Sequence, residues 1–262
     1  MGFSNPTRRV GKGFILLGFS NPTRRVGKWV NEVAKVGKEG KMATIRKFPL
    51  VTGEFYHIFN KSIAEYKIFN KEGDFVRMKR LLFYYQWEEN KIKFSKWKNM
   101  KEQNSFNNKS ITEDNNSRIV DIIAYCIMPT HIHLILKQLK SKGISIFMSL
   151  ISNSYAKYFN LKYKRKGPLW EREFQNVLVS SDEQLLHLSR YIHLNPTTAF
   201  LTKNPYDWRF SSYKEFLEEE HEEKICNFKD VLDINPKSYK EFVEDRISYQ
   251  RDLAKIKSLI LE

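Results

Sequence analysis

The sequence predicts an α+β fold, a ferredoxin-like βαββαβ antiparallel sheet with helices, followed by one more helix. Apolar β-branched runs alternate with segments of helical period in the order strand, helix, strand, strand, helix, strand. The chain has 262 residues, of which 41% are hydrophobic, enough for one core of generous size. In this split βαβ order two helices cover one face of the sheet and leave the other face for a site.

The first strand and the first helix are expected within residues 54–85. Residues 54–59 read Glu-Phe-Tyr-His-Ile-Phe, and such aromatic and β-branched content is typical of a strand. Asn70 is expected to cap a helix that runs to about residue 85. The buried stripe of this helix has helical spacing: Phe75, Met78, Leu82 and Tyr85. Residues 86–117 are polar and rich in Asn and Lys, which predicts an irregular excursion with room for one short helix.

Two strands joined by a turn are expected next. Residues 119–126 and 131–138 are apolar and β-branched, and Met-Pro-Thr at 128–130 is typical of a turn, so these strands should pair antiparallel. Residues 143–163 have helical spacing and end in a basic run. Residues 170–179 are expected to form the fourth strand.

The last helix of the domain follows the fourth strand. Ser180 and Glu183 form a capping box at its start. Its buried stripe also has helical spacing: Leu185, Leu188 and Ile192. Pro196 is expected to stop or kink the helix near Asn195. We therefore predict a domain over residues 42–217, and a helical C-terminal tail over residues 218–262 whose default interpretation is solvated packing.

The first 41 residues contain an identical duplication. GFSNPTRRVGK occupies residues 2–12 and again residues 18–28. Structural repeats drift in sequence while they keep their apolar positions, so perfect identity without an amphipathic pattern suggests recently duplicated DNA that is translated in frame. Residues 1–41 are thus expected to be a spurious or disordered extension, and the functional start is either Met1 or Met42. The alternative is a basic DNA-binding arm.

Composition favours a nucleic-acid partner. The formal net charge is +15 and the isoelectric point is about 9.6, although a lysine-rich surface can also serve solubility alone. Cys126 and Cys226 give neither a disulfide framework nor a zinc spacing, which favours a reducing, cytoplasmic and nucleoid-associated setting. No apolar stretch approaches the roughly 20 residues of a membrane span, so we expect no membrane partner. A monomer and a homodimer are both compatible with the sequence.

Two histidines in the third strand are the first candidate site residues. Side chains alternate along a strand, so His131 and His133 project from one face and supply half of a divalent-metal site. Two histidines can also occupy a half-buried sheet surface without any such role. Tyr191 and Asn195 lie one helical turn apart on the last helix, which could present both toward the histidines.

Together these four side chains indicate phosphodiester chemistry. Two imidazoles and an amide oxygen form a three-ligand site acceptable to Mg²⁺ or Mn²⁺. The Tyr191 phenol can attack a phosphodiester, releasing a 3′-hydroxyl and retaining the 5′-phosphate covalently. His57 and His193 are further candidates near this site. A packing role at the rim of the helix is the alternative for Tyr191.

Several motifs resemble those of the insertion-sequence-200-like single-tyrosine transposases, and in particular the REP-associated tyrosine transposases. The matching segments run in order from about residue 44 to residue 217: Tyr56–Lys61, Tyr125–Leu136, Gly167–Phe174, Arg190–Pro196 and Trp208–Tyr213. The resemblance implies the HUH endonuclease fold, metal-dependent cleavage of single-stranded DNA and a 5′-phosphotyrosine intermediate. It implies Tyr191 as the nucleophile, His131 and His133 as metal ligands, and Asn195 as the third ligand. Thr130 departs from the Asn that is frequent before the first histidine.

The expected partner is single-stranded or hairpin DNA of the REP-like repeat kind. Basic residues around one tryptophan would contact phosphates beside a base-stacking surface: Lys164, Arg165, Lys166, Trp170 and Arg172. Histidine-triad hydrolases share the strand pattern, but Ile135 stands where they carry a third histidine. A replication-initiator or relaxase-type nickase and a domesticated, non-cleaving hairpin-binding protein remain alternatives. The target sequence does not follow from these motifs.

Overall fold

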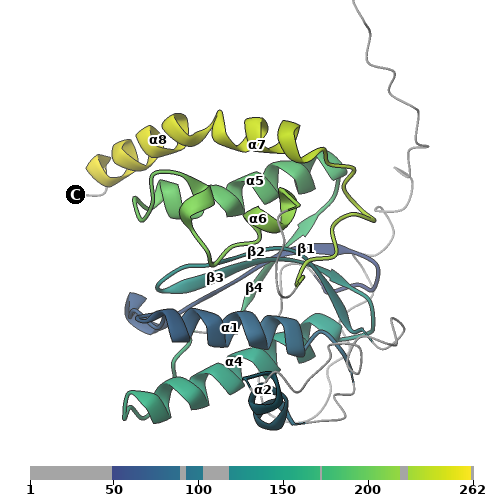
Figure 1. The fold of residues 1–262 in the computed structure, drawn as a ribbon, viewed down its shortest axis with the longest axis vertical. Helices are drawn as coiled ribbons and strands as arrows, with labels where there is room; N and C mark the ends of the chain where they lie inside the picture. Colours follow the sequence, from purple (N-terminus) through teal and green to yellow (C-terminus); the bar gives the residue numbers. More distant parts are fainter. Residues whose placement is uncertain (1–48, 89–92, 103–117, 172, 219–223, 261–262) are drawn as a thin grey trace, which may run out of the picture. The chain divides into compact units, whose positions relative to one another are not determined.

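The structure, a computed structural model, describes residues 49–88, 93–102, 118–171, 173–218 and 224–260 (Figure 1). The predicted extension over residues 1–41, most of the polar excursion and Arg172 lie outside these residues. None of the helices in the described parts of the chain is long and apolar enough to cross a membrane.

Four antiparallel strands form one sheet. They are β1 (Phe55–Lys61), β2 (Val120–Ile127), β3 (His131–Gln138) and β4 (Gln175–Val179), and their order across the sheet is β2-β3-β1-β4. Helices join β1 to β2 and β3 to β4, while β2 and β3 form a hairpin. This order and connectivity are those of the ferredoxin-like fold, so the predicted fold class is confirmed.

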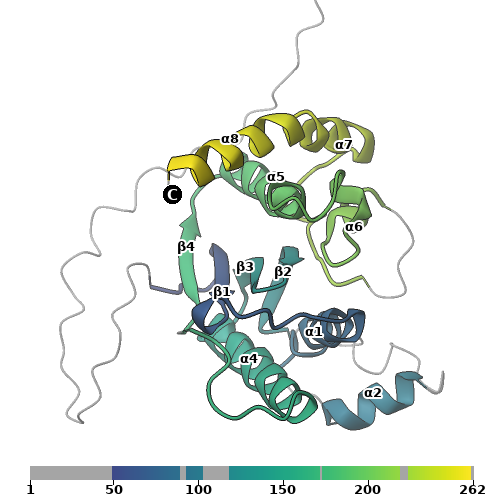
Figure 2. The same cartoon turned by 90° about the vertical axis from the view of Figure 1, so that its left-hand side faces the viewer.

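Within the described ranges, three helices lie on one side of the sheet. Helices α1 (Glu72–Tyr84) and α4 (Gly143–Lys162) pack against it, and α2 (Phe94–Glu102) lies beside them (Figures 1 and 2). Trp97 of α2 is fully buried and stacks on Phe83 of α1, so the first part of the excursion is helical and belongs to this core.

The second face of the sheet is covered more extensively than the sequence suggests. Helix α5 (Asp182–Thr198) packs on β2 and β3, and α6 (Tyr213–Phe216), α7 (Pro236–Glu244) and α8 (Ile247–Ile260) lie on the same side (Figure 2). Short 3₁₀ turns occur at Ile63–Glu65 and Pro205–Asp207. Because both faces are covered, all eight residues of β2 are buried. Tyr239 and Val243 of α7 belong to the second core, so this part of the C-terminal segment packs rather than remaining solvated.

The helix starts differ from those that the sequence predicts. Lys71 rather than Asn70 precedes α1, and the Asp74 carboxylate accepts the N–H groups of both residues at 2.9 and 3.1 Å. Ser181 rather than Ser180 caps α5, because its hydroxyl accepts the N–H of Gln184. Adjacent polar residues offer equivalent caps in sequence, and only the path of the incoming chain decides between them.

Two expected element ends are also wrong. Pro196 lies inside α5, which continues to Thr198. A proline in the last turn removes only one backbone hydrogen bond, and the helix ends two residues later. Strand β4 begins at Gln175 and not at residue 170. Trp170 forms only an isolated bridge with Ser62, and its indole N–H donates to the Ser152 carbonyl of α4 at 3.1 Å.

Asp74 is a buried carboxylate that ties α1 to the end of α4. Its side chain is 0% exposed and accepts hydrogen bonds from Tyr158, Lys162 and Tyr163 at 3.0, 2.6 and 2.6 Å, besides the two backbone N–H groups. Burial by itself raises the pKa of Asp74, but the hydrogen bonds from Lys162, Tyr163 and the Lys71 N–H outweigh burial and lower it.

We expect Asp74→Ala to lower the free energy of unfolding by roughly 2–4 kcal/mol, because two phenols and two backbone N–H groups lose a buried charged acceptor, while the exposed Lys162 ammonium returns to water. Urea unfolding at pH 7 measures this loss. Since the folded pKa is depressed, the Asp74 contribution is complete above the unfolded pKa and disappears as the pH falls through the folded value. The control is Glu72→Ala in the same helix, whose exposed ion pair with Arg209 should contribute less than about 1 kcal/mol. Equal losses for both variants would contradict the prediction.

Candidate active site

The histidines of β3 face α5 at one end of the sheet. Phe59 and Lys61 of β1 stand directly opposite His133 and His131, and His57 stands opposite Ile135. Directly opposed residues share a face, so these side chains project with the two histidines. The face is thus apolar under the middle of α5 and becomes polar toward His131 and Lys61.

The two histidines have the hydrogen-bond pattern of metal ligands. His133 is 7% exposed, and its Nδ1 lies 3.0 Å from Nε2 of His57, while Nδ1 of His131 lies 2.9 Å from the Thr130 hydroxyl. In both residues Nε2 is therefore the nitrogen left for a ligand. A metal-bound imidazole usually has its second nitrogen hydrogen-bonded, which fixes the ring.

Tyr191 extends from α5 over these imidazoles. Its ring is edge-on to His133 and His57, with centroids 5.9 and 6.3 Å apart and interplanar angles of 81° and 80°. The side chain is 45% exposed, and its hydroxyl has no hydrogen-bond partner among the residues that the structure describes. Burial of the remaining part raises the Tyr191 pKa, so attack by the phenol requires removal of its proton.

Asn195 lies one turn further along α5, on the same side as Tyr191. Its Nδ2 donates to the Tyr191 carbonyl at 3.1 Å and approaches the Ile192 carbonyl at 3.5 Å. Pro196 has no N–H for the Ile192 carbonyl, so the amide group compensates for this missing donor. With its nitrogen held by the helix, Asn195 makes no hydrogen bond through Oδ1, and none to either histidine, within the described residues.

These residues fit a divalent cation. Burial lowers the pKa of His131 to about 4, and burial together with His131, His57 and Lys61 lowers that of His133 to about 2, so both imidazoles are neutral donors at pH 7. With Asn195 Oδ1 they would form a two-nitrogen, one-oxygen set with positions left for water or phosphate oxygens. No group of three or more His, Cys, Asp or Glu side chains in the described ranges could hold a metal by itself.

We expect the protein to lose stability between pH 6.5 and about pH 4. Burial lowers the pKa of His57 and His131 to about 4 and that of His193 to about 3, whereas the unfolded chain has imidazoles near 6.5. In this window the unfolded state binds more protons, so acid favours unfolding. Urea midpoints at half-unit pH intervals measure the effect, and the metal-free protein should be used. A midpoint that is constant from pH 7 to pH 4.5 would contradict buried neutral histidines.

His193 is not part of this site. Its side chain is fully buried on the other side of α5, where Nδ1 and Nε2 each lie 2.8 Å from a hydroxyl, those of Tyr239 and Ser212. The expectation that His193 lies near the active site is therefore wrong. His57 does lie there, and the pairing of β1 with β3 is what brings it next to His133.

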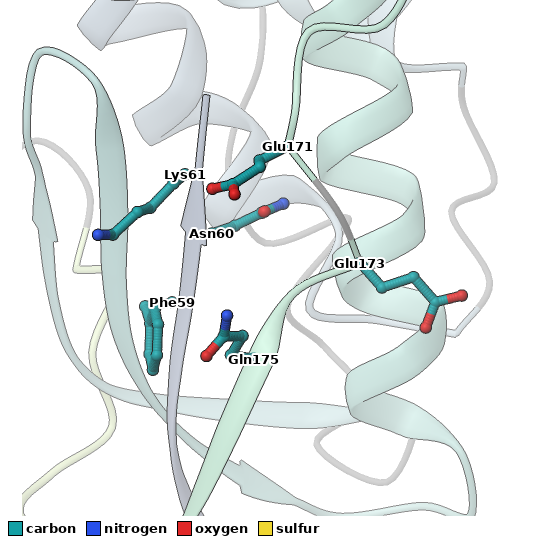
Figure 3. Close-up of a pocket in the computed structure, with 6 residues that line it drawn as sticks. All are labelled: Phe59, Asn60, Lys61, Glu171, Glu173 and Gln175. Atoms are coloured by element: carbon teal, nitrogen blue, oxygen red, sulfur yellow. The ribbon is translucent and has the colours of Figure 1, made fainter. Parts of the chain in front are cut away.

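Lys61, which the sequence did not single out, also lies at the site. It stands opposite His131 and lines a small pocket with Phe59, Asn60, Gln175 and two acidic residues, Glu171 and Glu173 (Figure 3). Lys61 and Phe59 extend to one side of β1 and Asn60 to the other, as strand alternation requires. The Lys61 ammonium forms no salt bridge within the described residues. The β1–β3 register is the signal that identifies Lys61, and the sequence alone does not supply it.

The basic loop after α4 is placed less uniformly than its sequence suggests. Lys164 and Lys166 are exposed. Arg165 is partly buried, where its guanidinium donates to Asn160 Oδ1 and lies 5.8 Å from the centre of the Tyr66 ring. Trp170 is also partly buried, 6.1 Å from Tyr155, so a large part of its ring packs against α4.

The chain matches a known family across the site. Residues 93–195 match the family model described as "Transposase IS200 like", and this segment includes both β3 histidines, Tyr191 and Asn195. This match confirms the resemblance to IS200-like transposases that the motifs predict.

One similar protein carries a narrower family name. A protein of Haemophilus influenzae, named as a REP-associated tyrosine transposase, is 27% identical over 104 residues, which make up 36% of this chain and 58% of that protein. The chain therefore spans less than two thirds of this relative. A solved structure described as a REP-associated tyrosine transposase bound to a REP hairpin covers 74% of this chain and 99% of its own, with a TM-score of 0.45 and 14% identity.

Proposed function

We propose that this protein is a metal-dependent single-strand DNA endonuclease and strand transferase that acts on hairpin or repeat DNA through a 5′-phosphotyrosine. One observation carries the proposal. The ring of Tyr191 lies against His133 and His57, its side chain is 45% exposed, and its hydroxyl has no hydrogen-bond partner among the described residues. A phenol that served only packing would be expected against apolar side chains, whereas Tyr191 lies against two imidazoles, one of which is a candidate metal ligand.

The reaction conserves one phosphodiester bond at each step. The Tyr191 oxygen bonds to phosphorus, the 3′-oxygen of the preceding nucleotide leaves and takes up a proton, and the 5′-phosphate remains on the tyrosine. Attack by a free 3′-hydroxyl reverses these bonds and joins a new strand. If Nε2 of His133 holds the cation, its Nδ1 carries the proton shared with Nε2 of His57, so His57 orients the His133 ring and the phenolic proton passes to solvent at the exposed edge of Tyr191.

His131, His133 and Asn195 would hold Mg²⁺ or Mn²⁺. Such a cation would polarise the phosphate oxygens and stabilise the charge that develops on the leaving oxygen. The Lys61 ammonium stands next to His131 and would attract the same phosphate. Lys164 and Lys166, both exposed, would contact the backbone of the flanking strand, consistent with the net charge of +15.

The test uses the full chain and two versions of one single-stranded hairpin oligonucleotide. With Mn²⁺ present, a 3′-end label should move to the position of the protein in a denaturing gel, and a 5′-end label should appear on a shorter released fragment. A 5′ label on the protein would contradict the proposed polarity of attack. Hairpin binding without either product would contradict the nuclease and support the non-cleaving hairpin-binding protein.

A further inference from the structure

A chain of buried hydrogen bonds holds α5 on the side away from the candidate site. His193 is at its centre, with Nδ1 2.8 Å from the hydroxyl of Tyr239 on α7 and Nε2 2.8 Å from the hydroxyl of Ser212 before α6. Ser212 also bonds to the backbone of Tyr125 in β2, and the Tyr239 hydroxyl lies 2.8 Å from that of Ser189 in α5. The network thus connects α5 to β2, α6 and α7.

The donors and acceptors of this network can be assigned from one end. The Ser189 hydroxyl donates to the Leu186 carbonyl, which can only accept. Its single proton is then used, so Tyr239 must donate to Ser189. The Tyr239 oxygen in turn accepts the proton on Nδ1 of His193, and Nε2 of His193 accepts the hydroxyl proton of Ser212.

The other end of the network agrees with this direction. The Ser212 hydroxyl accepts the N–H of Tyr125 at 2.9 Å, and the Tyr125 carbonyl already accepts the N–H of Ser212 at 2.9 Å. The Ser212 hydroxyl can therefore give its proton to His193, the nearer acceptor at 2.8 Å compared with 3.2 Å. With this direction every group is satisfied when His193 is neutral and protonated on Nδ1, and bonds to both ring nitrogens hold the ring in one orientation.

Helical geometry connects this network to the candidate site. His193 is two positions from both Tyr191 and Asn195, and two positions correspond to about 200° around a helix. Tyr191 and Asn195 therefore share one side of α5 while His193 occupies the opposite side. The apolar contacts of Leu185 and Ile192 are not directional, whereas the hydrogen bonds of His193 fix both the rotation of α5 and its position along its axis.

We propose that His193 is a positioning residue, which sets the orientation of Tyr191 over the β3 histidines through the network of Ser212, Tyr239 and Ser189. It touches no reacting atom. Its effect on the reaction rests on the proposed function of Tyr191, but its effect on the orientation of α5 does not.

The first experiment separates positioning from folding. Tyr239→Phe removes one oxygen from the network, His193→Leu removes both of its central bonds, and His187→Ala, an exposed histidine of the same helix, is the control. Adduct formation is measured at saturating hairpin DNA, below the temperature at which any variant begins to unfold. We expect the two network variants to form adduct roughly ten- to hundredfold more slowly, with DNA affinity within about threefold of wild type, because small displacements of a reacting group have effects of this size.

The second experiment needs no reaction. A 3-fluorotyrosine at position 191 should give one ¹⁹F resonance in the wild type and in the His187→Ala protein. In the network variants this resonance should broaden, and its chemical shift should move toward that of free fluorotyrosine. If Tyr239→Phe lowers thermal stability but leaves the adduct rate and the resonance unchanged, His193 is only a core residue and the proposal is overturned, whether or not His193→Leu folds. If the wild type forms no adduct, the proposed function fails while the fluorine spectrum still decides the role of His193.

Discussion

Replacement of Tyr191 with Phe should abolish the covalent protein–DNA adduct, with a rate reduced by roughly 10⁴-fold or more. The substitution removes only the oxygen that would bond to phosphorus and keeps the ring that lies against His133 and His57. The hydroxyl has no hydrogen-bond partner among the described residues, so its loss should leave the stability unchanged within about 0.5 kcal/mol. Hairpin binding, measured by fluorescence anisotropy, should persist.

A second tyrosine provides the matched control. Tyr249 on α8 is 53% exposed and outside the candidate site, so Tyr249→Phe should form the adduct at the wild-type rate. An adduct of undiminished yield in the Tyr191→Phe protein would exclude Tyr191 as the nucleophile. Mass spectrometry of the labelled peptide would then identify the residue that carries the DNA.

Replacement of His131 or His133 with Ala should reduce the affinity for Mn²⁺ by more than about 100-fold. Mutation of a residue that only hydrogen-bonds to a metal ligand already costs roughly 10- to 100-fold, and here the ligand itself is removed. The physical reason is the loss of one of two neutral nitrogens whose rings are held by Thr130 and His57. Isothermal titration with Mn²⁺ measures the affinity without any reaction. Adduct formation should fall in parallel and should also stop when a chelator removes the metal from the wild type.

The pH dependence of Mn²⁺ binding gives an independent check. Protons compete with the metal for an ordinary imidazole below about pH 6.5, whereas burial lowers the pKa of His131 to about 4. Affinity should therefore be nearly constant from pH 7 to pH 5.5. His187→Ala, which removes an exposed histidine, should bind Mn²⁺ as the wild type does. Unchanged affinity in both His131→Ala and His133→Ala would show that these residues do not hold the metal.

Local patterns were sufficient for most of the elements. Strand β3 begins at His131 and ends at Gln138, as its apolar run and the preceding Pro129 predict, and α4 ends within one residue of the expected position. Strand β3 is buried on both faces and is therefore almost continuously apolar, whereas α4 buries one face and shows helical spacing. The helix starts and the start of β4 were wrong because neighbouring polar or aromatic residues offered equivalent local choices.

His57 and His193 show where local reasoning ends. Both are histidines within motifs that resemble those of one transposase family, and nothing in their neighbours distinguishes them. Pairing of β1 with β3 brings His57 next to His133, whereas the rotation of α5 directs His193 into the core beside Tyr239. Each outcome depends on a contact between segments at least 46 positions apart in the chain.

The sequence by itself determined the ferredoxin-like order of elements, the shared face of His131 and His133, and the one-turn spacing of Tyr191 and Asn195. These follow from the periods of strands and helices, which are properties of the local backbone. Only the tertiary structure decided that His57 and Lys61 join the site and that a buried network holds α5 from behind. Strand register and helix rotation are determined by packing over the whole core, which no single segment of the sequence contains.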